Sequence, residues 1–537
     1  MREKSWSDTL GSASLQTATT TSRPDSYSRN ARLIETANRV LACDFCVGSS
    51  ERFDMLMELE GKKVLVIGAG RSGIAASRFM AARGALVVLN DRKEFIDWSN
   101  DALALKGEGV VKLLAGEVPS WLLDQIELVV LSPGVPASSI PVRYADRAGA
   151  EVVGEIELAW RFLKGRVVGI TGTNGKTTTT TLVGELLKDS GIPVQVGGNI
   201  GTPLVSLVES SRDDGWTVVE LSSYQLETIR EFHPTVALAL NLMPDHMDRY
   251  ATLADYGAAK HRIFLNQSAG DVAILNADDE TVASWAQGLE AHVVLFSTER
   301  ELEEGLFLRG RDLVARTRDG ERVLLTRDEM QLKGLHNVQN TLAALAAGLA
   351  CGASPDLMRE TIRRFAPVEH RLERVAEIGG VTFYNDSKAT NVDAAVKAVE
   401  ALADEPGKLI LILGGRGKNA PYAPLAPLLE RKGRALVTVG EDAQRIEREL
   451  ESFVPTERAA DMADAVRRAF GLAEPGDIIL LAPACASFDM FTSYEHRGRV
   501  FKEEVNALRI ADCGLRLWAA FAASIRQTPN PIRNLST

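Results

Sequence analysis

Short apolar runs alternate with amphipathic stretches along most of the chain. The runs at 63–67, 167–171, 216–220 and 409–414 are rich in Val, Ile and Leu, which is typical of strands buried on both faces of a parallel sheet. The first two are each followed by a glycine-rich turn and by apolar residues at helical spacing, as at 182–187. This alternation of strands and helices predicts an α/β fold.

Changes in the pattern divide the chain into parts. We expect three domains, at 59–154, 155–366 and 367–509. Residues 1–58 are rich in Ser, Thr and Arg and lack apolar runs, so we expect a disordered N-terminal extension. It contains no apolar segment typical of a secretory signal. Residues 510–537 form a C-terminal tail with one short apolar helix candidate.

Composition narrows the class of protein. Among 537 residues, Lys and Arg total 61 and Asp and Glu total 72, which argues against a nucleic-acid-binding surface. No segment reaches the roughly 18 consecutive apolar residues of a membrane span. The five cysteines are sparse and indicate a reducing, cytoplasmic location. Cys43 and Cys46 form an isolated CxxC, which without a second pair is better explained by chance than by zinc or redox chemistry.

The segment from 167 to 187 reads as a strand, a glycine-rich turn and a helix. Gly172 and Gly175 allow backbone N–H groups to approach an anion, Lys176 supplies a positive charge, and the Thr177 hydroxyl suits a phosphate-bound Mg²⁺. The strict P-loop pattern has glycine where this chain has Ile170. The segment therefore predicts a variant phosphate-binding loop, and its flanking strand and helix disfavour a chance lysine in a glycine-rich turn.

The first domain carries a second glycine motif. Gly68, Gly70 and Gly73 complete a GxGxxG pattern, and Asp91 follows near the end of the next strand. Taken alone, the motif indicates a Rossmann-like domain that binds NAD or FAD. Because GxGxxG is a weak signal by itself, a domain whose glycines serve only the turn and the helix packing is the less favoured alternative.

Polar residues in the central domain follow predicted strands. Glu220 ends one strand, and Asp245, His246 and Asp248 follow another, where acidic groups can reach a Mg²⁺ ion held by a triphosphate. Lys260 lies on a predicted helix, and the residues alone favour a solvated helix lysine there.

The third domain repeats the pattern of strands followed by polar loops. Such clusters on successive strands indicate a site for an anionic small molecule, although helix capping by some members is a competing explanation. The clusters are Asp386, Ser387, Lys388 and Thr390; Gly414, Gly415 and Lys418; and Ser487 and Tyr494.

Taken together and in order, these motifs resemble those of the Mur ligases, which build the peptide stem of peptidoglycan. The resemblance covers about 59–508 and implies three α/β domains: a Rossmann-like N-terminal domain, a central P-loop ATPase-type domain and a C-terminal Rossmann-like domain. The motifs that carry it are TGTNGKTT, ELSSYQLE, NLMPDHMDRY, GLHNVQN, EHRLE, NDSKATN, LGGRGK and LAPACASFDMFTSYEHRG.

Within that family, NDSKATN and ACASFDMF resemble the branch that adds D-glutamate to UDP-N-acetylmuramoyl-L-alanine. The resemblance implies that ATP first phosphorylates the terminal L-alanine carboxylate and that the D-glutamate amine then attacks the acyl phosphate. His246 is implied near the amine in a second role. We expect a cytoplasmic monomer with small-molecule substrates and no nucleic-acid partner.

The resemblance also implies a role for individual residues. The UDP-substrate site would comprise Arg71, Ser72, Gly73, Asp91, Arg92, Ser132, Gly134 and Asn199. The ATP site would comprise Gly172, Thr173, Asn174, Gly175, Lys176, Thr177, Thr178, Asn337, Asn340, Arg371 and Asp386. One Mg²⁺ would be held by Thr177 and Glu220, and a second by His246 and Lys260, the lysine carrying a carbamate formed with CO₂. Catalysis would involve Lys176, Glu220, His246 and Lys260. The D-glutamate site would comprise Lys388, Thr390, Lys418, Ser487 and Tyr494.

Three points stay open at this stage. Arg416 stands where relatives often have an acid, which puts the geometry around Lys418 in doubt. Another ligase of the same superfamily, adding L-alanine, a diamino acid or a folate-linked glutamate, is the alternative enzyme. A P-loop nucleotide switch or an NAD-sensing regulator is the alternative from a different class.

Overall fold

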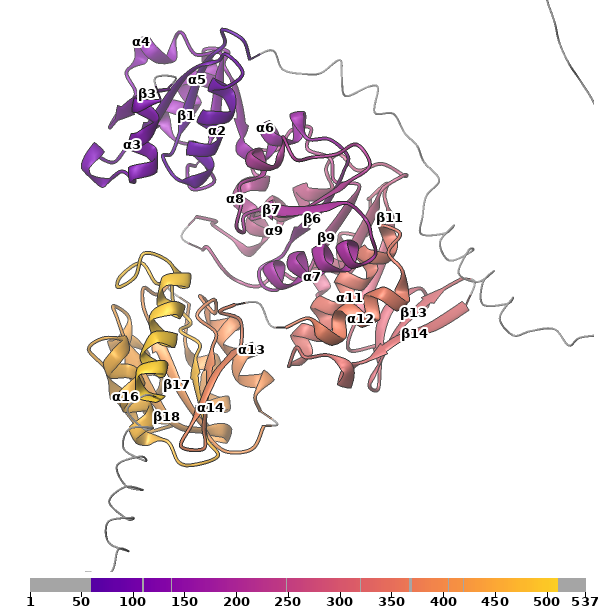
Figure 1. Cartoon of the computed structure of the whole chain (residues 1–537), viewed down its shortest axis with the longest axis vertical. Helices are drawn as coiled ribbons and strands as arrows, with labels where there is room; N and C mark the ends of the chain where they lie inside the picture. Colours follow the sequence, from indigo (N-terminus) through magenta and orange to yellow (C-terminus); the bar gives the residue numbers. More distant parts are fainter. Residues whose placement is uncertain are drawn as a thin grey trace, which may run out of the picture.

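The computed structural model describes residues 59–509 except 109–110, 137, 248, 319, 367–368, 404 and 419. Three sheets follow one another along the chain, each with its own helices (Figure 1). The expectations for 1–58, including the Cys43–Cys46 pair, for 510–537 and for Asp248 lie outside the described residues. The predicted α/β fold in three parts is confirmed, while the boundaries between the parts stay a prediction.

The first sheet is fully parallel, in the order β3-β2-β1-β4-β5. The strand order reverses beside β1, so a crevice is expected beyond the carboxyl ends of β1 and β4. The strands are β1 (Lys63–Ile67), β2 (Leu86–Asp91), β3 (Val111–Ala115), β4 (Leu128–Leu131) and β5 (Glu151–Gly154). The helices are α2 (Arg71–Ala81), η2 (Phe95–Asp97), α3 (Asn100–Gly107), α4 (Ser120–Leu123) and α5 (Ile140–Arg147).

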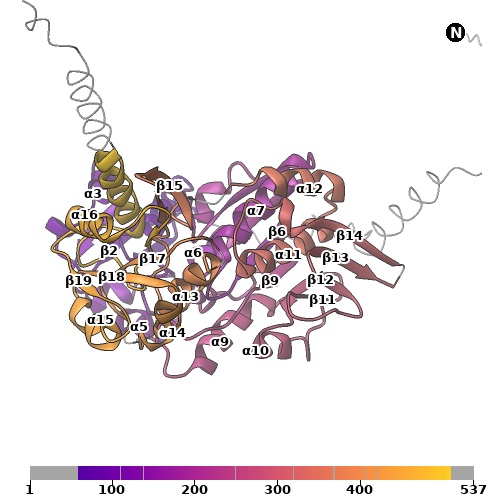
Figure 2. The ribbon, with the colours of Figure 1, turned by 90° about the horizontal axis from the view of Figure 1, so that it is seen from below.

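The second sheet has the order β14-β13-β12-β11-β10-β9-β6-β8-β7. Strands β7 to β12 run parallel, and the last two pairings, β12 with β13 and β13 with β14, are antiparallel. The sequence pattern did not predict this antiparallel arm, which lies far from the helix over 494–509 (Figure 2).

The phosphate-loop strand and helix, β6 and α7, lie where the sequence pattern predicts them. The strands are β6 (Arg166–Thr171), β7 (Val194–Gly198), β8 (Trp216–Glu220), β9 (Val236–Ala239), β10 (Val272–Asn276), β11 (His292–Ser297), β12 (Gly305–Arg309), β13 (Asp312–Thr317) and β14 (Gly320–Thr326). The helices are α6 (Glu155–Phe162), α7 (Lys176–Asp189), η3 (Leu204–Leu207), α8 (Ser223–Leu226), α9 (Leu253–His261), η4 (Arg262–Phe264), α10 (Glu280–Ser284), η5 (Arg327–Glu329), α11 (Leu335–Ala350) and α12 (Pro355–Arg364).

Helices α7 and α11 pack side by side on one face of the central sheet (Figure 1). Leu182 and Leu186 of α7 share a buried cluster with Leu342 and Leu345 of α11. Removal of these side chains from water stabilises the contact by about 2 kcal/mol for each leucine. The packing brings the amino-terminal ends of the two helices to one edge of the sheet.

The third sheet has the order β15-β16-β20-β17-β18-β19, and only β15 is antiparallel to its neighbour. Strands β16, β20 and β17 are adjacent, so the polar loops that follow them meet at one edge. The strands are β15 (Glu373–Ile378), β16 (Val381–Asn385), β17 (Leu409–Gly414), β18 (Gly433–Val439), β19 (Thr456–Arg458) and β20 (Ile478–Leu481). The helices are α13 (Val392–Ala401), η6 (Ala423–Leu425), α14 (Ala426–Lys432), α15 (Ala443–Leu450), α16 (Met462–Leu472) and the helix over 494–509.

Within the described residues, no helix is both long enough and apolar enough to cross a membrane.

Candidate active site

The loop between β6 and α7 has the conformation that its glycines allow. Gly172 and Gly175 have φ angles of 149° and 84°, which side-chain-bearing residues rarely adopt. A methyl group on Gly175 would also clash with the Asn340 side chain of α11. Both glycines are therefore needed for the loop to curve over the start of α7, where the helix dipole favours an anion.

Two lysines converge on this loop. Lys176 Nζ donates hydrogen bonds to the carbonyl oxygens of Gly172, at 2.8 Å, and Thr173, at 2.7 Å. Lys260 Nζ donates to the same Gly172 oxygen at 2.8 Å. Burial lowers the pKa of both ammonium groups, and for Lys260 the nearby charge of Lys176 lowers the pKa further. Lys260 is 1% exposed, so the interpretation as a solvated helix lysine is wrong.

Glu220 closes the other side of the loop at the end of β8. Its Oε2 accepts a hydrogen bond from Thr177 Oγ1 at 2.8 Å, and its Oε1 accepts one from Asn199 Nδ2 at 2.8 Å. The Thr177 hydroxyl and the Glu220 carboxylate therefore lie together at the amino-terminal end of α7. A hydroxyl and a carboxylate are the ligands that Mg²⁺ prefers beside a phosphate.

His246 adopts a left-handed backbone conformation, with φ of 56°. Its ring lies 5.0 Å from the Tyr224 ring, measured between centroids, and its Nε2 lies 3.7 Å from Asp245 Oδ2. Burial lowers the pKa of His246 to about 4, although Asp245 opposes the shift. The imidazole is therefore neutral near pH 7 and has a free lone pair for a metal ion or a proton.

A cavity of about 780 Å³ surrounds these groups between the central and third domains. It brings together nearly all the residues predicted for the ATP, metal and D-glutamate sites. Gly172 and Lys260 do not line it, because both lie behind the loop surface. The predicted residues that line it are Thr173, Asn174, Gly175, Lys176, Thr177, Thr178, Glu220, His246, Asn337, Asn340, Arg371, Asp386, Lys388, Thr390, Lys418, Ser487 and Tyr494.

Arg371 and Asp386 face this cavity from the third domain. Arg371 Nε is buried without a hydrogen-bond partner, which costs free energy unless a ligand supplies an acceptor. Burial raises the pKa of Asp386 to about 6, although the charge of Arg371 opposes the shift. An unpaired guanidinium N–H beside a carboxylate suits the polar groups of a nucleotide.

Lys388 and Tyr494 form the part of the cavity predicted for D-glutamate. Lys388 Nζ donates to Tyr494 Oη at 2.7 Å, and burial lowers the pKa of Lys388 to about 8. The buried Arg497 supports this region by donating hydrogen bonds to the carbonyl oxygens of Ser387 and Cys485. The competing explanation, helix capping by Asp386, does not hold for α13, because Asn391 caps that helix.

A second cavity, of about 1080 Å³, lies at the carboxyl end of the first sheet. Asp91 is engaged there with the protein backbone: Oδ2 accepts from the Ala69 N–H at 2.9 Å and Oδ1 from the Lys93 N–H at 3.1 Å. Gly73 does not line the cavity, because it packs against the Gly68 carbonyl, where a methyl group would clash. The predicted residues that line the cavity are Arg71, Ser72, Asp91, Arg92, Ser132, Gly134 and Asn199.

The two cavities have two lining residues in common, Pro133 and Asn199. A ligand in the second cavity can therefore extend past these residues to Lys176 and Glu220.

Comparisons with known proteins agree with this arrangement. Family models match residues 62–154, described as a Mur ligase MurD-like N-terminal domain, residues 170–348, described as a Mur ligase middle domain, and residues 370–485, described as a Mur ligase glutamate ligase domain. A UDP-N-acetylmuramoylalanine--D-glutamate ligase of Acidobacterium capsulatum is 47% identical over 455 residues, covering 84% of this chain and 98% of that protein. The chain belongs to the Mur ligase family.

Other relatives support the family at the levels of sequence and fold. A protein of the same name from Pelotomaculum thermopropionicum is 46% identical and is covered over its full length, with 85% of this chain aligned. The solved MurF ligase from Thermotoga maritima in complex with ADP has a TM-score of 0.54 and 16% identity, over 83% of this chain and 96% of that one. At 16% identity, the likeness to the MurF ligase structure shows the fold alone.

Asp393 and His336 of this Mur ligase also line the cleft and were not predicted. Asn174 Nδ2 donates to Asp393 Oδ2 at 2.6 Å, across the junction of the central and third domains. His336 also lines the first cavity, and burial lowers its pKa to about 4. Asp393 reads in the sequence as an ordinary acid at a helix start, so only the arrangement of the domains reveals its contact.

Arg416, the departure from the family pattern, lies outside the cleft. Its Nε donates to Glu441 Oε2 at 2.9 Å, and both side chains are exposed. The backbone of Arg416 pairs with Ala486. Because the side chain points to solvent, the substitution leaves Lys418 free to face the cavity.

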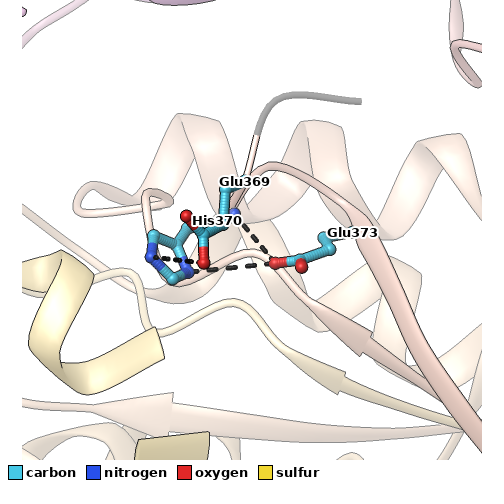
Figure 3. A group of neighbouring side chains, drawn as sticks. All are labelled: Glu369, His370 and Glu373. Atoms are coloured by element: carbon cyan, nitrogen blue, oxygen red, sulfur yellow. Dashed lines mark hydrogen bonds and ion pairs between the residues drawn. The ribbon is translucent and has the colours of Figure 1, made fainter. Parts of the chain in front are cut away.

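Glu369, His370 and Glu373 form a group whose ligand atoms lie close enough for a metal ion (Figure 3). Lys502 Nζ lies 2.6 Å from Glu369 Oε1 and 2.9 Å from Glu373 Oε1. The ammonium group already compensates both carboxylates, and His370 is held by Asn385. We therefore assign the group to the packing of β15 rather than to a metal site.

Proposed function

We propose that this Mur ligase joins D-glutamate to UDP-N-acetylmuramoyl-L-alanine with the hydrolysis of ATP to ADP and phosphate. The observation that carries the proposal is the junction of the two cavities at Pro133 and Asn199. It allows a long substrate to place one end on the first domain and its carboxylate beside the phosphate loop. The names of the relatives that are nearly half identical support the choice of amino acid.

The second cavity is proposed to hold the UDP moiety. In a dinucleotide-binding domain the acid at the end of the second strand binds a ribose diol. Here both oxygens of Asp91 accept backbone N–H groups, which leaves the carboxylate poorly placed for an NAD ribose. The exposed Arg71 at the start of α2 lines this cavity and donates only a long hydrogen bond, of 3.5 Å, to the Gly201 carbonyl oxygen, so its guanidinium group can turn to a diphosphate.

We expect UDP to bind the protein and NAD and FAD not to bind, as measured by calorimetry. Arg71→Ala should weaken UDP binding about tenfold, because it removes a charge-assisted contact to phosphate. Arg78→Ala is the matched control, since Arg78 lies on the same helix but pairs with Glu108. Tight binding of NAD, or equal effects of the two substitutions, would contradict the assignment.

In the first cavity, the γ-phosphate of ATP is proposed to move to the L-alanine carboxylate. A carboxylate is a poor electrophile, and the acyl phosphate that forms is a good one. Lys176, freed from the loop carbonyls, places its charge on the transferring phosphoryl oxygens. The D-glutamate amine then attacks the acyl carbon, forms the amide bond and expels phosphate, which takes up the proton released from the amine, while His246 is proposed to lie beside the amine in a second role.

The donor atoms present fit two Mg²⁺ ions. Thr177 and Glu220 would hold one, and His246 with a carbamylated Lys260 would hold the other. Mg²⁺ bound there would neutralise charge on the phosphate oxygens. Carbamylation needs a neutral amine, and the lowered pKa of Lys260 favours that form.

The third domain is proposed to bind D-glutamate through Lys388, Lys418, Thr390, Ser487 and Tyr494. Two lysines suit an amino acid with two carboxylates. Closure of this domain over ATP would exclude water, which would otherwise hydrolyse the acyl phosphate.

Phosphate release in the presence of UDP-N-acetylmuramoyl-L-alanine and ATP tests the proposal when amino acids are supplied one at a time. We expect release only with D-glutamate, together with a product whose mass corresponds to the new amide. A strong response to L-alanine or to a diamino acid would favour another ligase of the family. ATP turnover that does not depend on any amino acid would favour a nucleotide switch.

A further inference from the structure

Asp245 lies where the central and third domains meet. Its Oδ1 accepts a hydrogen bond from Lys418 Nζ at 2.9 Å, and its Oδ2 accepts one from Asn391 Nδ2 at 3.2 Å. The Asp245 side chain is 8% exposed and the Lys418 side chain 23%. One carboxylate of the central domain therefore holds two loops of the third domain.

The ion pair with Asp245 occupies Lys418, the residue that is proposed to bind a carboxylate of the amino-acid substrate. Within the described part of the chain, Asp245 is the only carboxylate at ion-pair distance from Lys418. Thr390 and Ser487 line the same cavity. A substrate carboxylate that approaches Lys418 meets an ammonium group that is already paired.

We propose that Asp245 is a positioning residue that stands in for the side-chain carboxylate of the amino-acid substrate. It holds Lys418 in place across the cleft, and the substrate carboxylate then replaces it on Lys418. The inference rests on the proposed function, in which Lys418 binds D-glutamate. One ion pair breaks as another forms, so the affinity for the substrate is lower than a free Lys418 would give.

The replacement of Asp245 by the substrate carboxylate on Lys418 would also affect the other neighbours of Asp245, which are Asn391 and His246. When Lys418 turns to the substrate, Asp245 keeps its contact with Asn391 and remains 3.7 Å from His246 Nε2. Its negative charge is then available to orient the imidazole beside the incoming amine. Arrival of the amino acid is in this way coupled to the orientation of the imidazole that lies beside its amine.

The test is the kinetics of Asp245→Asn, which keeps the side-chain size and removes the charge. We expect the KM for D-glutamate to fall about three- to tenfold, because Lys418 no longer has to leave a carboxylate. If Asp245 only held Lys418 in position, its replacement would give the opposite result, a higher KM for D-glutamate. Asp245→Ser serves as the second variant if the asparagine variant does not fold.

Glu405→Gln is the matched control. It removes another cross-domain carboxylate contact, that with Lys333 at 3.6 Å, without touching Lys418, and we expect no change in the KM for D-glutamate. A raised or unchanged KM in Asp245→Asn overturns the inference while the proposed function stands. Wild-type protein that forms no product with D-glutamate overturns both, and is recognised before any variant is measured.

Discussion

Replacement of Lys176 by alanine is expected to lower kcat by about a thousandfold or more. Lys176 lies at the start of α7 with its ammonium group at the phosphate loop. Burial lowers its pKa, which means that the charge is poorly solvated and interacts strongly with any anion in the cavity. Alanine removes that charge from the transferring phosphoryl group, where it is needed most in the transition state.

The measurement is phosphate release at saturating concentrations of all three substrates, with the unfolding temperature as a check on the fold. Lys188→Ala is the control, because Lys188 is on the same helix and its side chain is 66% exposed. We expect full activity from that variant. Activity of Lys176→Ala within tenfold of the wild type would rule out a role for Lys176 in phosphoryl transfer.

The local elements of the fold could be predicted from the sequence because local chemistry specifies them. A run such as 409–414 is apolar throughout and is fully buried in β17. Gly172 and Gly175 mark a turn in which only glycine fits comfortably. The polar loops of the third domain were predicted to meet, and they do so because β20 lies between β16 and β17.

The contacts between domains could not be predicted in the same way. Asp245 and Lys418 are distant in sequence, and their ion pair depends on the orientation of two separately folded sheets. The hairpin of β13 and β14 was also not predicted, because the start of β14 is exposed and lacks an alternating apolar face.

The burial of Lys260 is the clearest example of a feature that the sequence around it does not predict. The stretch around it on α9 offers only a weak amphipathic pattern, with Gly257 and Ala259 among its buried residues. Nothing local distinguishes a lysine on the solvent face from one that enters the core. The resemblance to the Mur ligases implied a metal role, and the observed burial against the Tyr256 ring is compatible with that role, which stays a prediction.

Lys260→Ala is expected to lose activity about a hundredfold or more and to regain part of it when formate or acetate is added. In the proposed enzyme the neutral amine adds CO₂ and releases a proton, so that a cation becomes a carboxylate. Alanine leaves a space in a buried site close to the charge of Lys176. A small carboxylate can enter that space and supply the missing oxygen atoms.

We expect formate or acetate to raise the kcat of Lys260→Ala at least about tenfold, a change of roughly 1.4 kcal/mol in the activation barrier. Lys176→Ala is the control for this rescue, because an added acid cannot replace a lost cation. Propionate and larger acids should rescue less well, since the site is enclosed by the Gly172 carbonyl and the Tyr256 ring. A fully active Lys260→Ala variant, or equal responses of the two variants to formate, would show that Lys260 serves the fold and not the metal site.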